Sequence, residues 1–326
     1  MRQRELFGIT PIQIAMSDYS KHIEILPNVH LVRGENAARF PEANTLLIDD
    51  EILTLVDAGS SLQNISIALR NLNHEISDIQ RIVLTHFHID HKGYAADIQK
   101  IANCELICHS LAEIGVRTFQ GLIELYGIEG HKYYTTWQSY ISQRFGHVMG
   151  NYNVTSTFTD GKPISCGEND LIPIHLPGHT IDHTCFGING YDTIFLTDID
   201  LTNFGPWYGN KVSDIEDFKK SVERVIDLRP SMGISSHLID PVLVDIDERL
   251  RKFRRVFDER EKRILDNISK GYDTIEKLSQ KPTIYPRIPK DVYFVFEMFM
   301  LEKHIDILES NGKVVEENGH LRIEKR

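Results

Sequence analysis

Residues 86–91, with the sequence HFHIDH, contain three histidines and an aspartate within six positions. Neutral imidazole and carboxylate groups are ligands for zinc and for other first-row divalent metals. The spacing allows His86 and His88 to bind one ion, whereas Asp90 and His91 can turn toward a second. A lone histidine in a loop is more often solvated or hydrogen bonded, but a cluster of this density predicts a metal site.

The elements on either side of this cluster would position its side chains. Residues 81–84 (RIVL) form a short apolar run that predicts a buried strand, and residues 94–101 predict a helix. Earlier apolar runs at 29–32, 44–48 and 52–56 predict three more strands. The cluster therefore lies on the turn that leaves a strand, where side chains can converge on one point.

Three more candidate ligands stand in the same kind of place, where an apolar strand runs into a loop. His179 follows one strand-like stretch, and Asp198 and His237 each end another. The Asn189-Gly190 pair predicts a hairpin between two of these strands. Each of the three residues could therefore reach one shared edge of the fold.

The order of these elements resembles that of the metallo-β-lactamase superfamily over roughly residues 25–240. The resemblance implies an α/β fold in which two sheets lie between helical layers, a four-layer αββα sandwich. It also implies a ligand set in which one group binds the first ion, another binds the second, and one aspartate bridges them. These groups are His86, His88 and His179, then Asp90, His91 and His237, with Asp198 as the bridge.

Two features of the aspartates qualify this resemblance. The superfamily has Gly-Asp where this chain has TDID (197–200), and both aspartates point to the same side of an extended chain. The register favours Asp198 as the bridging ligand, with Asp200 as the alternative. Asp57, in the sequence DAG, resembles an aspartate that braces the metal loop by hydrogen bonding, so we expect it to contact a ligand and not the metal.

The resemblance implies two divalent ions, for which we expect zinc, although manganese and iron accept the same donors. Such ions would share a water whose pKa falls to roughly 7, so that a bridging hydroxide attacks a carbonyl or phosphoryl centre. Asp90 and His183 are the candidate catalytic residues. His183 lies four residues after His179 and would either donate a proton near the substrate or pack against the ligand loop, and the packing role is slightly favoured.

Aromatic residues gather in two places that bear on substrate binding. They are frequent at 111–160, where we predict one or two helices that cover the mouth of the site and govern substrate choice. Packing between helices explains any single one of these aromatic residues somewhat better. Trp207 and Tyr208, in FGPWYG (204–209), would either line the pocket or plug the loop beneath it.

Composition narrows the class of protein. The net charge of −11 over 326 residues argues against binding nucleic acid through bulk charge. Residues 1–7 contain two arginines and no apolar stretch follows, so we expect a cytoplasmic protein without signal peptide or membrane span. We predict a hydrolase of a small ester, thioester or lactone. A compact single-strand endoribonuclease is one alternative, and a mononuclear iron persulfide dioxygenase, which would use fewer ligands, is another.

Residues 248–326 form a second predicted domain, after a catalytic domain at 1–247. Three helices and a hairpin are predicted, at 249–268, 274–278, 292–309 and 313–323. They resemble a winged helix, which occurs in one branch of lactamase-like hydrolases. The third helix carries five apolar residues, Phe294, Phe296, Met298, Phe299 and Met300. This predicts packing against the main domain or a partner subunit, not a face that reads a DNA groove, so we expect a structural or homodimerisation role.

Overall fold

The computed structural model describes residues 20–287 and 291–324, and two large sheets dominate it. The first sheet has seven strands in chain order, antiparallel from β1 to β4 and parallel from β4 to β7. Its strands are β1 (His22–Leu26), β2 (Val29–Val32), β3 (Thr45–Ile48), β4 (Thr54–Val56), β5 (Arg81–Val83), β6 (Glu105–His109) and β7 (Ser156–Phe158). The strands predicted around the HFHIDH segment are therefore confirmed.

The second sheet has six strands in the order β13-β12-β11-β10-β9-β8. They are β8 (Ile164–Ser165), β9 (Asp170–His175), β10 (Thr184–Ile188), β11 (Thr193–Thr197), β12 (Met232–Ser235) and β13 (Val242–Val244). The predicted hairpin joins β10 to β11, and both Asn189 (φ 56°) and Gly190 (φ 140°) have the positive φ that a tight turn requires. The strands β9, β11 and β12 thus precede the three later candidate ligands.

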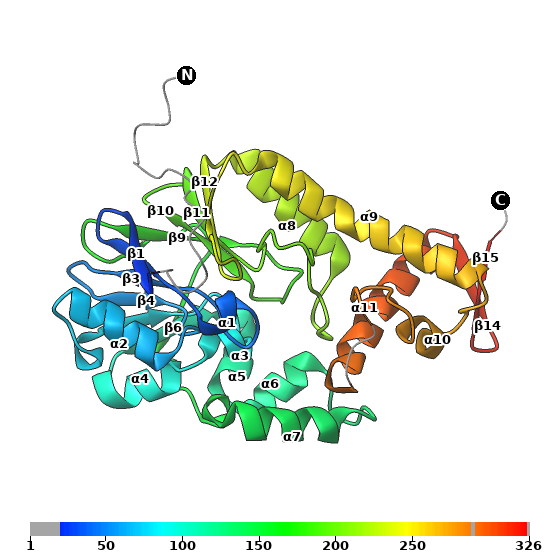
Figure 1. The fold of residues 1–326 in the computed structure, drawn as a ribbon, viewed down its shortest axis with the longest axis horizontal. Helices are drawn as coiled ribbons and strands as arrows, with labels where there is room; N and C mark the ends of the chain where they lie inside the picture. The colour runs from blue at the N-terminus through cyan, green and yellow to red at the C-terminus, as the bar shows by residue number, and fades with distance from the viewer. Residues whose placement is uncertain (1–19, 288–290, 325–326) are drawn as a thin grey trace.

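The two sheets pack face to face, with helices on both outer faces (Figure 1). Apolar residues from both sheets fill the interface, including Leu46 and Val83 from the first and Phe186 and Phe195 from the second. Helices α2 (Leu62–Asn71) and α4 (Ala95–Ala102) cover the first sheet, and α8 (Ile215–Leu228) covers the second. The predicted arrangement of two sheets between helical layers is confirmed.

Between β6 and β7 the chain leaves the first sheet and forms helices below it (Figure 1). These are α5 (Glu113–Arg117), α6 (Phe119–Tyr126) and α7 (Tyr134–Arg144). The sequence predicted one or two helices at 111–160, and the structure corrects that number to three. Gly127, in the left-handed conformation (φ 73°), ends α6 and separates helices that periodicity alone does not divide.

The C-terminal part contains the predicted helices and hairpin. They are α9 (Asp247–Ser269), α10 (Ile275–Ser279), α11 (Asp291–Ser310), β14 (Val314–Glu317) and β15 (His320–Ile323). A single apolar cluster includes Phe218 of α8, Phe257 of α9 and Leu301 of α11, so the C-terminal helices share one core with the second sheet. The resemblance to a winged helix and the formation of a homodimer remain predictions. Among the described residues, no helix is both long and apolar enough to cross a membrane.

The third C-terminal helix, α11, packs on the rest of the chain. This is one of the two predicted alternatives; the other was packing against a partner subunit. Phe296 lies 5.4 Å from the ring of Trp207 and 5.9 Å from that of Tyr126, measured between ring centroids. Phe294 stacks on Tyr133 at 5.7 Å. The aromatic face of α11 is therefore used within the chain.

Candidate metal centre

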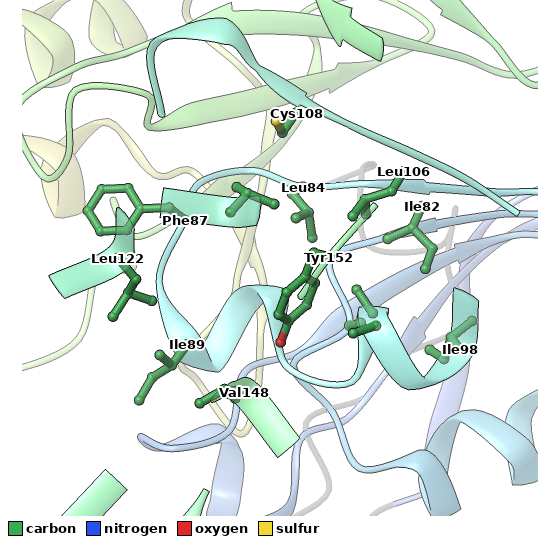
Figure 2. Packing of buried hydrophobic residues seen from close by; sticks show 14 of the residues in the cluster. Ile82, Leu84, Phe87, Ile89, Ile98, Leu106, Cys108, Leu122, Val148 and Tyr152 are labelled. Carbon is green, nitrogen blue, oxygen red and sulfur yellow. The ribbon is translucent and has the colours of Figure 1, made fainter. Parts of the chain in front are cut away.

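The ligand loop begins where β5 ends, and its side chains divide between the core and the candidate metal centre. The side chain of Phe87 is fully buried and packs into the core with Leu122 (Figure 2). The histidines on either side of Phe87 face each other instead, with His86 Nε2 3.0 Å from His88 Nδ1.

The aspartate at the end of β4 braces this loop. Asp57 Oδ1 accepts a hydrogen bond from the backbone N–H of Thr85 (2.8 Å), and Oδ2 accepts one from the Thr85 hydroxyl (2.9 Å). His91 Nδ1 donates to Asp57 Oδ2 at 2.7 Å. A side chain at Gly59 would place its Cβ 1.9 Å from the carbonyl oxygen of Asp90, so only glycine allows the approach. Asp57 thus contacts a candidate ligand, as expected.

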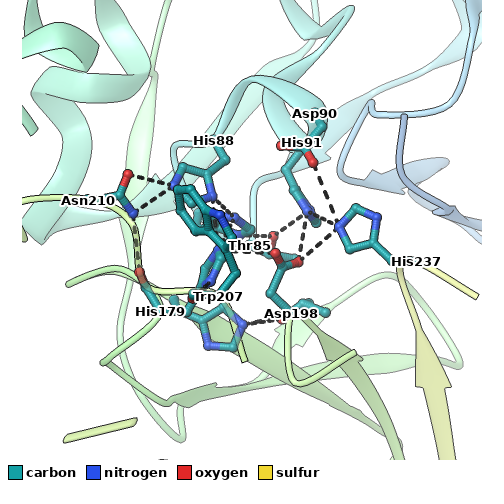
Figure 3. A network of polar contacts seen from close by, with 12 residues as sticks. Thr85, His88, Asp90, His91, His179, Asp198, Trp207, Asn210 and His237 are labelled. Atoms are coloured by element: carbon teal, nitrogen blue, oxygen red, sulfur yellow. Dashed lines mark hydrogen bonds and ion pairs between the residues drawn. The ribbon is translucent and has the colours of Figure 1, made fainter. Parts of the chain in front are cut away.

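Seven side chains converge in two adjacent groups at this edge (Figure 3). In each group the candidate ligand atoms lie within 4.8 Å of one another; the groups are His86, His88, His179 and Asp198, then Asp90, His91 and His237. In the first group, His179 Nε2 lies 2.9 Å from His88 Nδ1 and 3.3 Å from His86 Nε2. Zinc–nitrogen bonds of about 2.0–2.1 Å in a tetrahedral site place ligand nitrogens roughly 3.3 Å apart. The donor set fits a divalent metal.

The second nitrogen of each histidine is held by the protein. Such contacts fix the tautomer and aim the other nitrogen at the metal. His179 Nδ1 donates to the carbonyl oxygen of Trp207, and His237 Nδ1 donates to that of Ala38, each at 2.8 Å. The remaining partners are Thr85 Oγ1 for His86 (3.0 Å), Asn210 Oδ1 for His88 (3.2 Å) and Asp57 for His91.

Asp198 lies between the two groups. Its Oδ2 is 3.1 Å from His179 Nε2, and its Oδ1 is 2.9 Å from His91 Nε2 and 3.4 Å from His237 Nε2. Burial would raise the pKa of Asp198, but the three surrounding histidines outweigh burial and hold its pKa well below the usual range. Asp200 instead accepts a hydrogen bond from the backbone N–H of Thr202 at 3.0 Å and belongs to neither group. The geometry favours Asp198 as the bridging residue.

The histidines differ in how readily they take up protons. Burial, reinforced by the neighbouring imidazoles, lowers the pKa of His86 and His88 well below the usual range, so both present lone pairs. Burial also acts on His91 and His237, but the carboxylates of Asp198, Asp57 and Asp90 outweigh it. The pKa of His91 is raised well above its usual value, and that of His237 rises to about 9. A metal ion at the second group would take the place of protons on these imidazoles.

His183 is not placed as a proton donor, which corrects its prediction as a candidate catalytic residue. Its Nδ1 donates to the carbonyl oxygen of Leu176 at 2.9 Å, and its Nε2 accepts from the Thr197 hydroxyl at 2.6 Å. Burial lowers the pKa of His183 to about 3, so the ring is neutral and both nitrogens are engaged. It packs against the strand end that carries Asp198, which is the packing role favoured above.

Trp207 and Tyr208 lie in different environments. Trp207 lines the cleft above the metal centre, with its ring 5.3 Å from that of His88. Tyr208 does not line the cleft, which corrects its prediction as a pocket residue. Its side chain is fully buried, and its hydroxyl contacts Arg260 (3.0 Å) and His304 (2.7 Å). The two neighbouring side chains therefore point in different directions, one to the cleft and the other to the C-terminal helices.

A cleft of about 1520 Å³ opens above the candidate ligands. Aromatic side chains form much of its wall, and most come from the helical insertion, the 204–207 loop and the C-terminal part. They are Phe40, Tyr126, Trp137, Tyr140, Phe204, Trp207, Tyr285, Tyr293 and Phe296. Lys21, Arg39 and Arg287, all exposed, also line it. The insertion therefore reaches the site, as predicted, whereas the cations and the C-terminal aromatic residues were not anticipated.

Comparison with known proteins agrees with this geometry. The family model described as metallo-beta-lactamase superfamily matches residues 39–237, well over half of the chain. The probable metallo-hydrolase YqjP of Bacillus subtilis (strain 168) is 23% identical over 294 residues, which are 82% of this chain and 88% of that protein. An atrochrysone carboxyl ACP thioesterase of Claviceps purpurea (strain 20.1) is 23% identical over 246 residues, covering 74% of this chain and 66% of that protein.

Solved structures share the fold. A metallo-beta-lactamase family protein from Thermus thermophilus superposes with a TM-score of 0.71 at 18% identity, covering 92% of this chain and all of that one. A beta-lactamase domain protein from Burkholderia ambifaria gives a TM-score of 0.67 at 18% identity, covering 93% and 94%. At these identities the likeness concerns the fold alone. Both superpositions cover more than nine-tenths of this chain, so they include most of the C-terminal helices as well as the two sheets.

Proposed function

The chain belongs to the metallo-beta-lactamase superfamily, and from that membership we propose that it is a dinuclear metal-dependent hydrolase that cleaves thioesters or related esters and lactones. One observation carries this proposal: two ligand groups lie side by side with Asp198 between them. Pairs of metal ions roughly 3.5–4 Å apart serve hydrolytic displacements in other two-metal sites. We place His86, His88 and His179 on one ion and Asp90, His91 and His237 on the other.

Two zinc ions are the proposed cofactors, because imidazole is the main donor in both groups. When bound, such ions lower the pKa of a shared water and polarise the substrate oxygen. The chain's own residues hold and orient the reacting groups. Asp90, whose Oδ2 lies 3.7 Å from His237 Nε2, is the proposed acceptor for the proton that leaves the attacking water.

The cleft supports a thioester built on a long anionic carrier. Its volume of about 1520 Å³ exceeds the roughly 300–1000 Å³ of sites for drug-sized ligands. The aromatic wall suits an apolar or planar acyl group, and the exposed cations Lys21, Arg39 and Arg287 suit phosphate or carboxylate groups on the carrier. Three of the similar proteins are named as ACP thioesterases, which supports the same class of substrate.

The test combines metal analysis with a panel of substrates. We expect close to two zinc ions per chain in protein purified without chelator, and release of thiol from acyl-coenzyme A that stops when the metal is removed and returns when zinc is added. Protein loaded with two ions that leaves thioesters, esters and lactones intact would refute the proposal.

The four cysteines are buried free thiols, which supports a reducing, cytoplasmic location.

Single-stranded RNA is the second candidate substrate, and the wall of the cleft favours it for a specific reason. Aromatic side chains next to exposed cations are the features on which unpaired bases stack and phosphates bind. A short RNA in the same panel distinguishes the two. Cleavage of RNA without thioester hydrolysis would make the protein a compact endoribonuclease.

A further inference from the structure

The loop from Phe204 to Tyr208 lies between the metal centre and the C-terminal helices. On the metal side, the carbonyl oxygen of Trp207 accepts the hydrogen bond that orients His179. On the other side, Gly205 (φ 79°) approaches α9 so closely that a Cβ there would lie 2.9 Å from the side chain of Val256. A displacement of this loop would therefore move the partner of a candidate metal ligand.

Arg260 of α9 holds the loop from below. Its side chain is only 1% exposed, and it is among the largest fully buried side chains of the described residues. Nη1 donates to the carbonyl oxygen of Pro206 and to the hydroxyl of Tyr208 (3.0 Å), and Nη2 donates to the carbonyl oxygen of Phe204 (2.8 Å). The guanidinium group also lies over the ring of Phe204, 4.8 Å from its centroid.

Burying the charge of Arg260 costs free energy, so the hydrogen bonds from Arg260 to the 204–208 loop are needed to offset that cost. An ionised group taken out of water is strongly destabilising unless hydrogen bonds replace its hydration. The hydrogen bonds that the structure gives Arg260 all go to the backbone or hydroxyl groups of this one loop. A planar fork of donors can bind several carbonyls at fixed angles, which the single ammonium group of lysine cannot do.

A second contact fixes the same loop by way of α11. The indole Nε1 of Trp207 donates to the hydroxyl of Tyr285 at 3.0 Å. Tyr285 is itself held, because its backbone N–H donates to Glu297 Oε2 at 3.0 Å and that of Ile284 donates to Oε1 at 2.9 Å. Glu297 is fully buried on α11. The loop is thus held from two C-terminal helices at once.

We propose that Arg260 is a positioning residue of the metal centre, acting through the 204–208 loop and the Trp207 carbonyl on His179. This inference rests on the metal centre proposed above. It gives the C-terminal helices a role in the site itself: they hold the ligand of one ion, the ion bound by His86, His88 and His179. The group formed by Asp90, His91 and His237 depends on Ala38 and Asp57 and does not use this loop.

The test measures metal affinity, which needs no substrate. Metal-free Arg260→Met and wild-type protein are titrated with Co²⁺, read by its visible absorption, and with Zn²⁺ in competition. We expect one ion to bind as in wild type and the other to bind about 10- to 100-fold more weakly, the usual cost of losing an outer partner of a ligand. The absorption bands of the weakened site should change shape as well, because His179 is reoriented.

A matched control is Arg255→Met, because Arg255 lies on the same helix with an exposed side chain paired to Glu248 at 2.8 Å. It should bind both ions as wild type does. A folded Arg260→Met protein that binds both ions normally, or that loses both equally, overturns the proposal. If Arg260→Met does not fold, Arg260→Lys decides, because it keeps the charge but not the fork of donors: weaker binding at the same ion supports the proposal, and unchanged binding overturns it.

These outcomes are separable from those of the proposed activity. A wild-type protein that binds two ions but hydrolyses no thioester would refute the substrate assignment and leave the role of Arg260 intact. Normal thioester hydrolysis by an Arg260→Met protein with two tightly bound ions would refute the role of Arg260 and leave the activity intact.

Discussion

His91 Nδ1 lies 2.7 Å from Oδ2 of Asp57, and both side chains are completely buried. This pair joins the end of β4 to the ligand loop after β5, and it directs His91 Nε2 toward Asp198 at 2.9 Å. The same carboxylate accepts two hydrogen bonds from Thr85. One aspartate outside the ligand set therefore fixes both the backbone of the loop and the orientation of a ligand.

Asp57→Asn should weaken metal binding at the second group. The amide keeps the shape of the side chain but removes the charge that makes His91 a stronger donor, and such changes cost about 10- to 100-fold in metal affinity. Competition titration with zinc and a chromophoric chelator measures it. Asp227→Asn, an exposed aspartate on α8, is the control. Equal zinc affinity in the two variants would show that Asp57 does not tune the site.

His88→Ala should abolish activity and release metal while leaving the fold largely intact. His88 Nδ1 faces His86 and His179, and removal of its ring leaves the first group with two histidines. Elemental analysis should fall from about two ions per chain to one or fewer, with an unchanged far-ultraviolet circular dichroism spectrum. His320→Ala, at an exposed position on β15, should keep both ions. A single iron in the wild-type protein would instead favour the dioxygenase alternative.

Acid should destabilise the protein partly through His304. Burial lowers the pKa of His304 to about 3, from an ordinary value near 6.5. The unfolded chain therefore binds one more proton than the folded chain between these values. The contribution of His304 to the free energy of unfolding is therefore fully present above about pH 6.5. It is lost as the pH falls toward 3, by about 1.4 kcal/mol per pH unit.

His304→Gln should reduce that slope. Urea unfolding of metal-free protein between pH 4.5 and 7.5 measures it, and the comparison with wild type cancels groups that titrate in both proteins. His320→Gln is the control, because it makes the same substitution at a surface position, where His320 pairs with Asp273. An identical pH dependence in the wild type and His304→Gln would mean that His304 is protonated in the folded protein.

The candidate ligands were predictable from sequence because each stands where an apolar strand ends, and strand ends meet at one edge of the two sheets. Of their partners, Asp57 was predicted, and the others were not predictable for a physical reason. The carbonyl oxygens of Ala38 and Trp207 orient two histidines, and a backbone carbonyl carries no sequence signal. Asn210, which contacts His88, follows no pattern that distinguishes it from any other loop asparagine.

Arg260 could have been placed better from the sequence. Arg260 falls on the buried stripe of α9, in step with Phe253, Phe257 and Ile264 at helical spacing. A charged residue at such a position indicates a dedicated buried partner, but only the structure shows that the partner is the loop beside His179.

Arg39→Gln and Arg287→Gln should each raise the KM for an anionic thioester about two- to fivefold, with little change in kcat. Both side chains are exposed and line the cleft away from the ligands, and exposed charged contacts contribute modestly to binding. Acyl-coenzyme A and the same acyl group on neutral N-acetylcysteamine are compared by thiol release. Only the anionic thioester should respond, and added salt should reproduce the effect in wild type because it screens these charges. Lys220→Gln, an exposed cation on α8 outside the cleft, should leave both substrates unaffected. Equal losses with the charged and the neutral thioester would place the cations outside the path of the carrier.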